Sequence, residues 1–171
     1  MSPAIDLTST ATAPFQATSE HRLLLSFVGM WSGPTKLWLD PAAPPTETTT
    51  ELEGESVLGG RWLRLTYTGT AFEKPHAGEM LVGFHKDPGQ YELAWVDSSH
   101  TGSAIMLSRG KVSSTGLVNV LGDYLAGDQR WGWRTLLSRP SDNELLIEAF
   151  NVTPDGKEEL AIQSRLQRRN L

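Results

Sequence analysis

The chain has 171 residues, of which 39% are hydrophobic and 20% are charged, and it contains no cysteine. This length and apolar fraction indicate one globular domain with a substantial core, and the lack of cysteine excludes disulfides, thiolate metal sites and a cysteine nucleophile. The formal net charge of −5 argues against binding to nucleic acid or to an anionic membrane.

Residues 1–17 are small and polar, contain two prolines, and predict a flexible N-terminal tail. This segment has neither the basic start nor the apolar block of a signal peptide. The apolar runs elsewhere in the sequence are too short to span a bilayer. We therefore expect a cytoplasmic protein in which residues 18–171 form a single domain.

Residues 18–29 predict a short helix. Thr18 or Ser19 can cap its N-terminus, and Gly29 suits the left-handed residue that ends many helices. Four apolar residues at helical spacing form one stripe: Leu23, Leu24, Phe27 and Val28. A helix of about ten residues is marginal in water unless it docks, so we expect it to cover one end of a closed sheet.

From Trp31 onward the pattern is strand, turn, strand, without βαβ alternation. The expected strands are residues 31–39, 46–58, 61–69, 77–85, 90–97, 101–110, 111–121, 130–138, 144–152 and 157–168. Large sheets tend to curl, and closure removes their exposed edges. We therefore predict an all-β fold, an antiparallel barrel of about ten strands with the helix closing one end. A two-sheet sandwich is the structural alternative.

The Gly59-Gly60 pair suits a two-residue hairpin turn. In that register Val57 lies opposite Trp62 on a solvated face. The residues of the other face are then interior: Leu52, Ser56, Leu63, Leu65 and Tyr67.

A symmetric closure of residues 130–138 onto residues 144–152 places Arg134 opposite Glu148. On the outer face this pair is an ordinary surface ion pair, worth about 0–1 kcal/mol. On the inner face it is buried and can orient a polar ligand group. Apolar neighbours such as Leu136 and Phe150 slightly favour the inner face, so both placements stay open.

Asp97 and His100 are the strongest candidates for acid–base chemistry or for metal binding, since they lie three residues apart near a strand end. The structural alternative is a turn in which Asp97 accepts hydrogen bonds from the backbone. His76 and His85 belong to no recognisable ligand motif, so a metal site is not expected. His85 is a weaker catalytic candidate, because it faces inward in only one of two registers.

The main functional hypothesis is a barrel that binds a small apolar or amphipathic molecule in its interior. The expected walls are Leu63, Leu65, Tyr67, Trp95, Trp133 and Ile147, with Asp97, Arg134 and Glu148 as polar groups that orient the ligand. One alternative is an enzyme, a hydrolase or an isomerase, on the same barrel. Another is a filled barrel that serves protein interaction, including assembly into a homodimer.

Two groups of residues resemble known families. Gly29-x-Trp31 directly after a helix, with Arg168 late in the last strand, resembles the calycin pattern of lipocalins and fatty-acid-binding proteins. That resemblance implies a structural clasp between Trp31 and Arg168, with Arg165 as the second choice. A larger set resembles the bacterial, lipocalin-like DUF1579 family, whose function is unassigned: Leu58-Gly59-Gly60-Arg61-Trp62-Leu63, Gly83-Phe84-His85, Trp95-Val96-Asp97, Arg134-Thr135, Glu148 and Arg168.

Nitrobindin, a ten-stranded calycin barrel that binds haem, is a further point of resemblance. In nitrobindin a histidine near the C-terminus holds the iron, whereas the last histidine here is His100. The closing strand therefore offers no matching ligand, and we expect neither haem nor another cofactor.

Overall fold

The structure is a computed structural model that describes residues 15–113 and 117–169. Residues 1–14 of the predicted tail, residues 114–116 of the predicted strand 111–121, and residues 170–171 lie outside the described residues. The described ranges form one helix and ten strands: α1 (Ser19–Ser26), β1 (Gly29–Leu37), β2 (Thr46–Val57), β3 (Trp62–Ala71), β4 (Lys74–His85), β5 (Gln90–Asp97), β6 (Met106–Lys111), β7 (Val118–Ala126), β8 (Gln129–Ser141), β9 (Glu144–Val152) and β10 (Glu158–Arg168). No helix in these ranges is long and apolar enough to cross a membrane.

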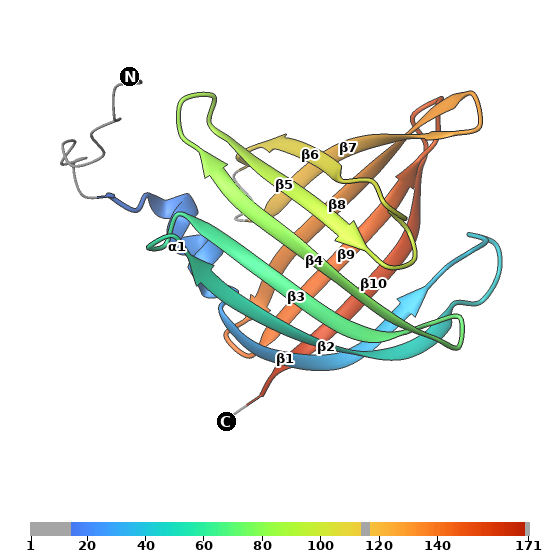
Figure 1. Ribbon diagram of the computed structural model, residues 1–171, viewed down its shortest axis with the longest axis horizontal. Coiled ribbons are helices and arrows are strands. Elements are labelled where there is room, and N and C mark those ends of the chain that lie inside the picture. Colours follow the sequence, from blue (N-terminus) through green and yellow to red (C-terminus); the bar gives the residue numbers. More distant parts are fainter. Residues whose placement is uncertain (1–14, 114–116, 170–171) are drawn as a thin grey trace, which may run out of the picture.

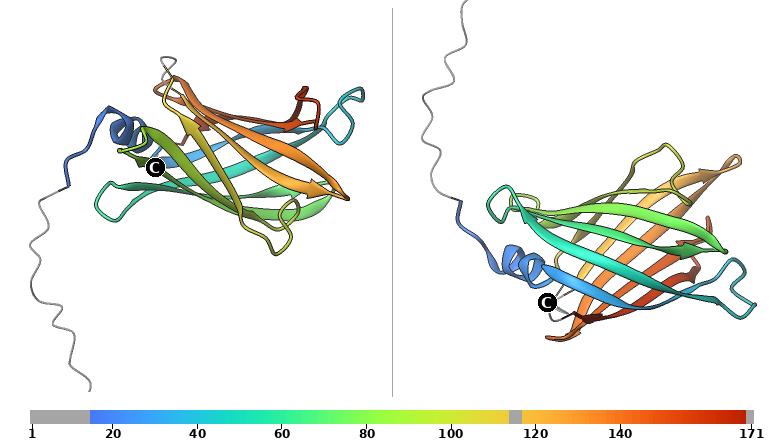
Figure 2. Two further views of the ribbon diagram at one scale, coloured as in Figure 1. Left: turned by 90° about the horizontal axis from the view of Figure 1, so that it is seen from above. Right: turned by 60° about the horizontal axis from the view of Figure 1, so that its bottom comes forward.

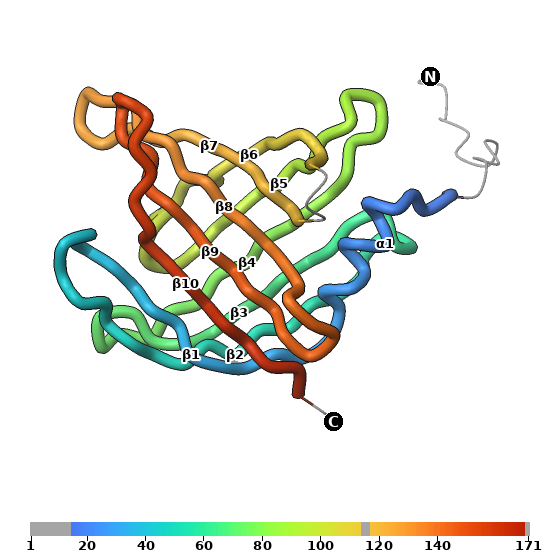
Figure 3. The backbone as a smooth tube through the Cα atoms, turned by 180° about the vertical axis from the view of Figure 1, so that it is seen from behind, coloured from blue at the N-terminus to red at the C-terminus, as the bar shows by residue number. Residues whose placement is uncertain are grey.

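The strands form one closed barrel in the order β1-β10-β9-β8-β7-β6-β5-β4-β3-β2 (Figure 1). Antiparallel pairing of β1 with both β2 and β10 closes the sheet, and Figure 3 shows β10 lying beside β1. Closure satisfies the backbone groups that the edges of an open sheet leave free. The predicted all-β barrel is confirmed, and the two-sheet sandwich is wrong.

Helix α1 covers the end of the barrel at which β1 begins (Figure 2). Leu24 of α1 and Phe27, the residue that follows the helix, are 1% and 0% exposed and belong to the apolar core of the barrel. At the N-terminus of α1, the backbone nitrogen and the hydroxyl oxygen of Thr18 lie 3.3 Å and 2.9 Å from Nδ1 of His21. Core packing holds this helix in place, as its short length requires.

Two arginines bind the carbonyl groups at the C-terminal end of α1. Arg168 Nη1 donates to the carbonyl of Val28 at 2.9 Å, and Arg139 Nη1 donates to the carbonyl of Ser26 at 2.6 Å. Both guanidinium groups lie over the ring of Trp31, at 4.1 Å from its centroid for Arg168 and 5.4 Å for Arg139. The predicted contact between Trp31 and Arg168 is confirmed, and Arg139 is a further member of this clasp that the sequence did not reveal.

Gly29 connects α1 to β1 with a φ of +130°. This value is positive, as predicted, but it lies outside the left-handed helical region that the capping interpretation requires. A Cβ at this position would clash with Nη1 of Arg168. Glycine suits this position because a φ of +130° strains any residue with a Cβ, and because the guanidinium group of Arg168 lies against it.

The β2–β3 hairpin has the predicted register, with Val57 opposite Trp62. Its connection is a four-residue loop, residues 58–61, instead of a two-residue turn. Residues 58–60 of this loop have positive φ values of +50°, +68° and +86°. The interior face is also as predicted, except that Ser56, close to the end of β2, is exposed.

The strands predicted at 101–110 and 111–121 are displaced, because residues 98–105 form a loop. Local hydrogen bonds hold this loop. The backbone N–H of Asp97 donates to the hydroxyl of Thr101 at 2.8 Å, and the N–H of Ala104 donates to the carbonyl of Thr101 at 2.9 Å. Strand β6 therefore starts later than predicted, and β7 continues to Ala126.

The predicted register between β8 and β9 is wrong by two residues. Arg134 pairs with Phe150, and Glu148 pairs with Leu136. The cause is an irregularity between Ser138 and Ser141, in a stretch that contains Pro140, which has no N–H to donate to a regular ladder. A shift by two residues keeps every side chain on its face of the sheet but changes every partner.

Candidate functional site

A cavity of about 560 Å³ opens at the end of the barrel opposite α1. We call it the mouth cavity. Apolar side chains form most of its wall: Leu37, Trp38, Leu39, Phe72, Trp95, Ala104, Ile105, Met106, Leu125, Trp133, Ala161 and Ile162. A few polar side chains complete it, among them His100, Thr101, Asp123 and Asn151. The volume falls within the range of about 300–1,000 Å³ that is usual for small-molecule sites.

Two tryptophans form a flat wall of the mouth cavity. The rings of Trp95 and Trp133 stack with centroids 5.4 Å apart and an interplanar angle of 19°. The ring of His100 lies 5.6 Å from that of Trp95, with a tilt of 35°. This wall offers a broad apolar surface with an imidazole at its edge, which suits a ligand that is mainly apolar and carries a polar group.

Deeper in the barrel the free space narrows to a volume of about 50 Å³. This inner space shares Leu37, Trp95, Trp133 and Ile162 with the mouth cavity. It also reaches Thr35, which contacts the hydroxyls of Thr50 and Ser164 at 2.7 Å and 2.8 Å. A space of this size and polarity suits a few waters.

The expectation that Leu63 and Leu65 line a binding cavity is wrong. Both residues are 0% exposed, belong to the packed core, and contribute to neither of these spaces. Four other predicted wall residues do line one or both spaces: Tyr67, Trp95, Trp133 and Ile147. Leu63 and Leu65 line neither space because the half of the barrel next to α1 is filled by side chains, so that free space is left near the mouth.

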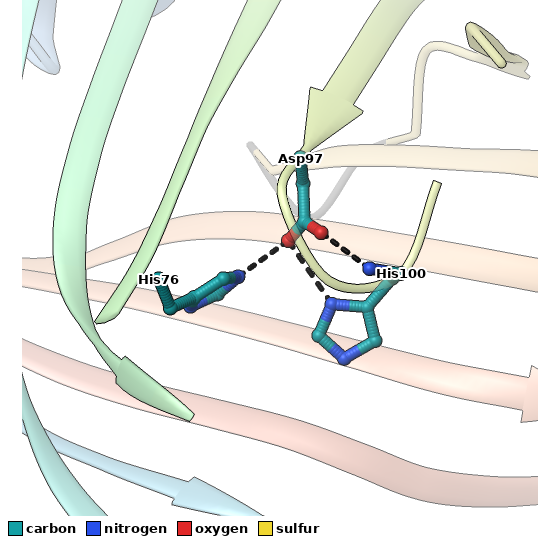
Figure 4. Close-up of side chains that lie close together, drawn as sticks. All are labelled: His76, Asp97 and His100. Atoms are coloured by element: carbon teal, nitrogen blue, oxygen red, sulfur yellow. Dashed lines mark hydrogen bonds and ion pairs between the residues drawn. The ribbon is translucent and has the colours of Figure 1, made fainter. Parts of the chain in front are cut away.

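Asp97 ends β5 with a side chain that is 0% exposed, and three polar groups converge on its Oδ2 atom. The hydroxyl of Tyr67 donates at 2.9 Å, while His76 Nε2 and His100 Nδ1 lie at 2.5 Å and 3.0 Å (Figure 4). The backbone N–H of Ser99 donates to Oδ1 at 2.6 Å. We call His76, Asp97 and His100 the histidine–aspartate cluster.

The sheet register brings Tyr67 to this cluster. Tyr67 pairs with Gly78, and Gly78 pairs with Asp97 on the next strand. A Cβ at Gly78 would clash with the phenol of Tyr67, so glycine lets the tyrosine cross β4. The phenol oxygen also accepts a hydrogen bond from Trp95 Nε1 at 2.8 Å, which connects the cavity wall to the buried carboxylate.

His76 joins Asp97 and His100 in the folded chain, although no ligand motif in the sequence includes it. A signal for it was present in the β4–β5 hairpin, whose register pairs His85 with Gln90 and Gly78 with Asp97. His76 precedes Gly78 by two residues on β4, which makes it a diagonal neighbour of Asp97. Diagonal neighbours are within reach of long side chains.

Hydrogen bonding controls the charge of Asp97. Burial by itself raises the pKa of the Asp97 carboxyl, but hydrogen bonds from His100 and His76 and from the backbone N–H groups of His100 and Ser99 outweigh it and hold that pKa well below its usual range. Burial, followed by the charge of Asp97, raises the pKa of Tyr67 far above its usual value. At neutral pH the site therefore holds a carboxylate anion next to a neutral phenol that donates to it.

A family model described as "Protein of unknown function (DUF1579)" matches residues 16–168. The chain belongs to the DUF1579 family. The match covers α1 and all the strands from β1 to β10, which confirms the predicted resemblance. No curated protein matches the chain.

Two of the solved structures that share the fold of this DUF1579 chain illustrate the similarity. The crystal structure of Rv2717c from M. tuberculosis matches with a TM-score of 0.62 and 18% identity, over 91% of this chain and 100% of that chain. The S-type phycobiliprotein lyase CPES from Guillardia theta matches with a TM-score of 0.57 and 14% identity, over 90% of this chain and 94% of that chain. At these identities the similarity shows the barrel fold.

The interior placement of Arg134 and Glu148 is wrong for this DUF1579 chain. Arg134 Nε donates to Glu158 at 2.7 Å, and Glu148 accepts a hydrogen bond from Gln163 at 2.9 Å. Arg134 alternates with the buried Trp133 and Thr135 on β8, so it faces outward. Neither residue lines the mouth cavity or the inner space, and the predicted ion pair between them does not form.

His85 lies away from the histidine–aspartate cluster. It is the last residue of β4, at the end of the barrel that α1 covers, and its side chain is 55% exposed. Its Nδ1 atom lies 3.7 Å from a carboxylate oxygen of Glu92. The prediction that His85 is a catalytic candidate therefore loses its structural basis, since the residue lines neither the mouth cavity nor the inner space.

Proposed function

We propose that this DUF1579 barrel binds a small, mainly apolar molecule with one hydrogen-bonding group in the mouth cavity. The mouth cavity itself carries the proposal, because it combines ligand-sized volume, a stacked tryptophan wall and a small number of polar groups. The apolar part of the ligand packs on Trp95 and Trp133, and its polar group faces His100.

Native mass spectrometry of freshly purified protein tests this proposal directly, because a retained ligand appears as an added mass. A second assay uses the apolar dye 1-anilinonaphthalene-8-sulfonate as a probe of the mouth cavity. The informative variant is Ile105→Glu, which places a charge on the cavity wall, where Ile105 is 65% exposed. We expect the Kd of the dye to rise by about tenfold or more, which corresponds to about 1.4 kcal/mol.

Leu107→Glu is the matched control. Leu107 is 61% exposed but lies on the outer face of β6, away from the mouth cavity. We expect it to leave dye binding unchanged. Equal effects of the two variants, or the absence of saturable dye binding to the unaltered protein, would contradict the proposal.

A second candidate function is an enzyme that transforms the bound molecule by acid–base chemistry. The observation that favours it is His100, which lines the mouth cavity and contacts the buried carboxylate of Asp97. One solved structure of this fold is named a lyase. Incubation of the protein with its retained ligand, followed by mass analysis of the small molecule, distinguishes the two: turnover changes the ligand mass, and binding alone returns it intact.

A further inference from the structure

The histidine–aspartate cluster presents three atoms of the types that bind transition metals. They are His76 Nε2, Asp97 Oδ2 and His100 Nδ1, and all three lie within 4.8 Å of one another. Figure 4 shows both imidazole rings turned toward the same carboxylate oxygen. His76 comes from the start of β4, Asp97 from the end of β5, and His100 from the loop that follows β5.

More groups converge on Asp97 than its carboxylate can accept as hydrogen bonds. Oδ2 receives Tyr67, His76 and His100, and Oδ1 receives the backbone N–H groups of Ser99 and His100. A carboxylate offers about four lone-pair sites over both oxygens. The excess falls on Oδ2, which is the atom that both imidazoles face. A cation shared by the two imidazoles and Oδ2 resolves this excess, because the nitrogens then act as ligands and no longer compete as donors.

We propose that His76 Nε2, Asp97 Oδ2 and His100 Nδ1 bind one divalent transition-metal ion of the zinc class. Two imidazoles and one carboxylate are a ligand set that suits zinc and its neighbours, whereas magnesium and calcium prefer oxygen ligands throughout. The fourth position is left to water or to a bound molecule. This site rests on the cluster alone and does not depend on the function proposed above.

The required rearrangement is small. At metal–ligand distances of about 2.0–2.2 Å, the donor atoms of a tetrahedral site lie about 3.3–3.5 Å apart. The distances from Asp97 Oδ2 to His76 Nε2 and His100 Nδ1 are 2.5 Å and 3.0 Å, so each must open by about 1 Å or less. The two imidazole nitrogens lie within 4.8 Å of one another, so their separation must close by about 1.5 Å or less. His76 lies near the start of β4 and His100 in the loop after β5.

Partners around the cluster orient its members toward one another. Asp97 is fixed by Tyr67 at one oxygen and by the backbone N–H of Ser99 at the other. The ring of His76 packs edge-on against Tyr67, with centroids 5.4 Å apart, and the ring of His100 packs against Trp95. Such outer contacts orient metal ligands, and their loss typically lowers metal affinity about 10–100-fold.

The test is titration of chelator-treated protein with Zn²⁺ by isothermal calorimetry and with Co²⁺ by visible absorption. We expect one equivalent to bind and Co²⁺ to give the intense absorption of a tetrahedral site. His76→Ala and His100→Ala should each weaken binding by more than about 100-fold, and Tyr67→Phe by about 10–100-fold. His85→Ala is the matched control, because His85 lies outside the cluster, and it should bind the metal as tightly as the unaltered protein.

A correctly folded protein that binds neither ion at one equivalent would overturn the proposal, and so would an effect of His85→Ala equal to that of His76→Ala. If an alanine variant does not fold, nuclear magnetic resonance of the unaltered protein provides the decision. Addition of Zn²⁺ must then shift the ring nitrogen signals of His76 and His100 and leave those of His85 in place. Ring signals that stay unshifted at one equivalent refute the site.

Discussion

Tyr67 connects the wall of the mouth cavity to the buried carboxylate through two hydrogen bonds on one oxygen. It accepts from Trp95 Nε1 at 2.8 Å and donates to Asp97 at 2.9 Å. Because burial and the charge of Asp97 raise the pKa of this phenol, it stays protonated and keeps donating across the physiological pH range. A single atom thereby fixes the orientation of one cavity tryptophan and of the carboxylate.

The variant Tyr67→Phe removes that atom and leaves the buried indole N–H of Trp95 without its acceptor. We expect a loss of about 1–3 kcal/mol in the free energy of unfolding, measured by urea denaturation. Tyr124→Phe is the control, since the hydroxyl of Tyr124 bonds the half-buried Asn151 at 2.8 Å and its loss should cost less. Equal losses for the two variants would show that the Tyr67 hydrogen bonds add nothing specific.

His21 is the second residue whose protonation state the fold fixes. It is 5% exposed, and its Nδ1 faces Thr18 at the N-terminus of α1. Burial lowers the pKa of His21, the nearby Glu20 opposes that shift, and Arg61 adds to it. The folded protein therefore resists protonation of this ring more than the unfolded chain does.

Protonation of His21 makes the folded protein less stable at low pH. The unfolded chain takes up the proton as the pH falls through about 6.5, whereas folded His21 stays neutral to lower pH, so the free energy of unfolding decreases on acidification. We expect urea denaturation to show a smaller decrease between pH 7.5 and pH 5.5 in His21→Gln than in the unaltered protein. An unchanged pH dependence in His21→Gln would refute the assignment.

At the scale of elements, α1 depends on an arginine from the last strand, β10. Arg168 Nη1 donates to the carbonyl of Val28, and Nη2 donates to the carbonyl of Ser26 at 3.3 Å, while the guanidinium group covers Trp31. Positive charge at the C-terminal end of a helix also opposes the negative end of its dipole. The last strand therefore stabilises the first element of the chain.

Arg168→Met should remove these contacts while retaining much of the side-chain volume. We expect a loss of about 1.5–3 kcal/mol in the free energy of unfolding, because hydrogen bonds from charged groups are lost together with the cation–π contact. Arg165→Met is the matched control on the same strand, where the arginine is 52% exposed and pairs with Glu144. Exposed pairs contribute about 0–1 kcal/mol, so a loss at Arg165 as large as that at Arg168 would contradict the special role of the clasp.

Elements with local signals were predictable from the sequence, and elements that depend on irregular backbone were not. The glycine pair at 59–60 fixed the β2–β3 register, since a hairpin is set by its own turn. The irregularity near Pro140 could not be placed in advance, because its effect depends on which backbone groups pair across the strands. Only residues 101–105 of the loop at 98–105 contradict the strand prediction, because the loop's hydrogen bonds to Thr101 and Asp97 form only in the folded chain.

At the scale of the whole molecule, barrel closure was predictable from strand number, spacing and the Trp31–Arg168 pattern. The location of free space was not, because alternation shows that Leu63 and Leu65 face inward but not whether side chains from the opposite wall fill the space. His76 shows the same limit for the site, because a cluster assembled across β4 and β5 leaves no short motif in the sequence.

The closed end of the barrel also holds both ends of the described chain. The segment before α1 starts there, and after β10 the backbone N–H of Arg169 donates to the carbonyl of Met30 at 2.8 Å beside the start of β1 (Figure 3). Attachment at either end, through a fused neighbouring domain or through immobilisation on a sensor surface, would therefore leave the opposite end facing solvent. The mouth cavity would then stay open to solvent while the protein itself is tethered.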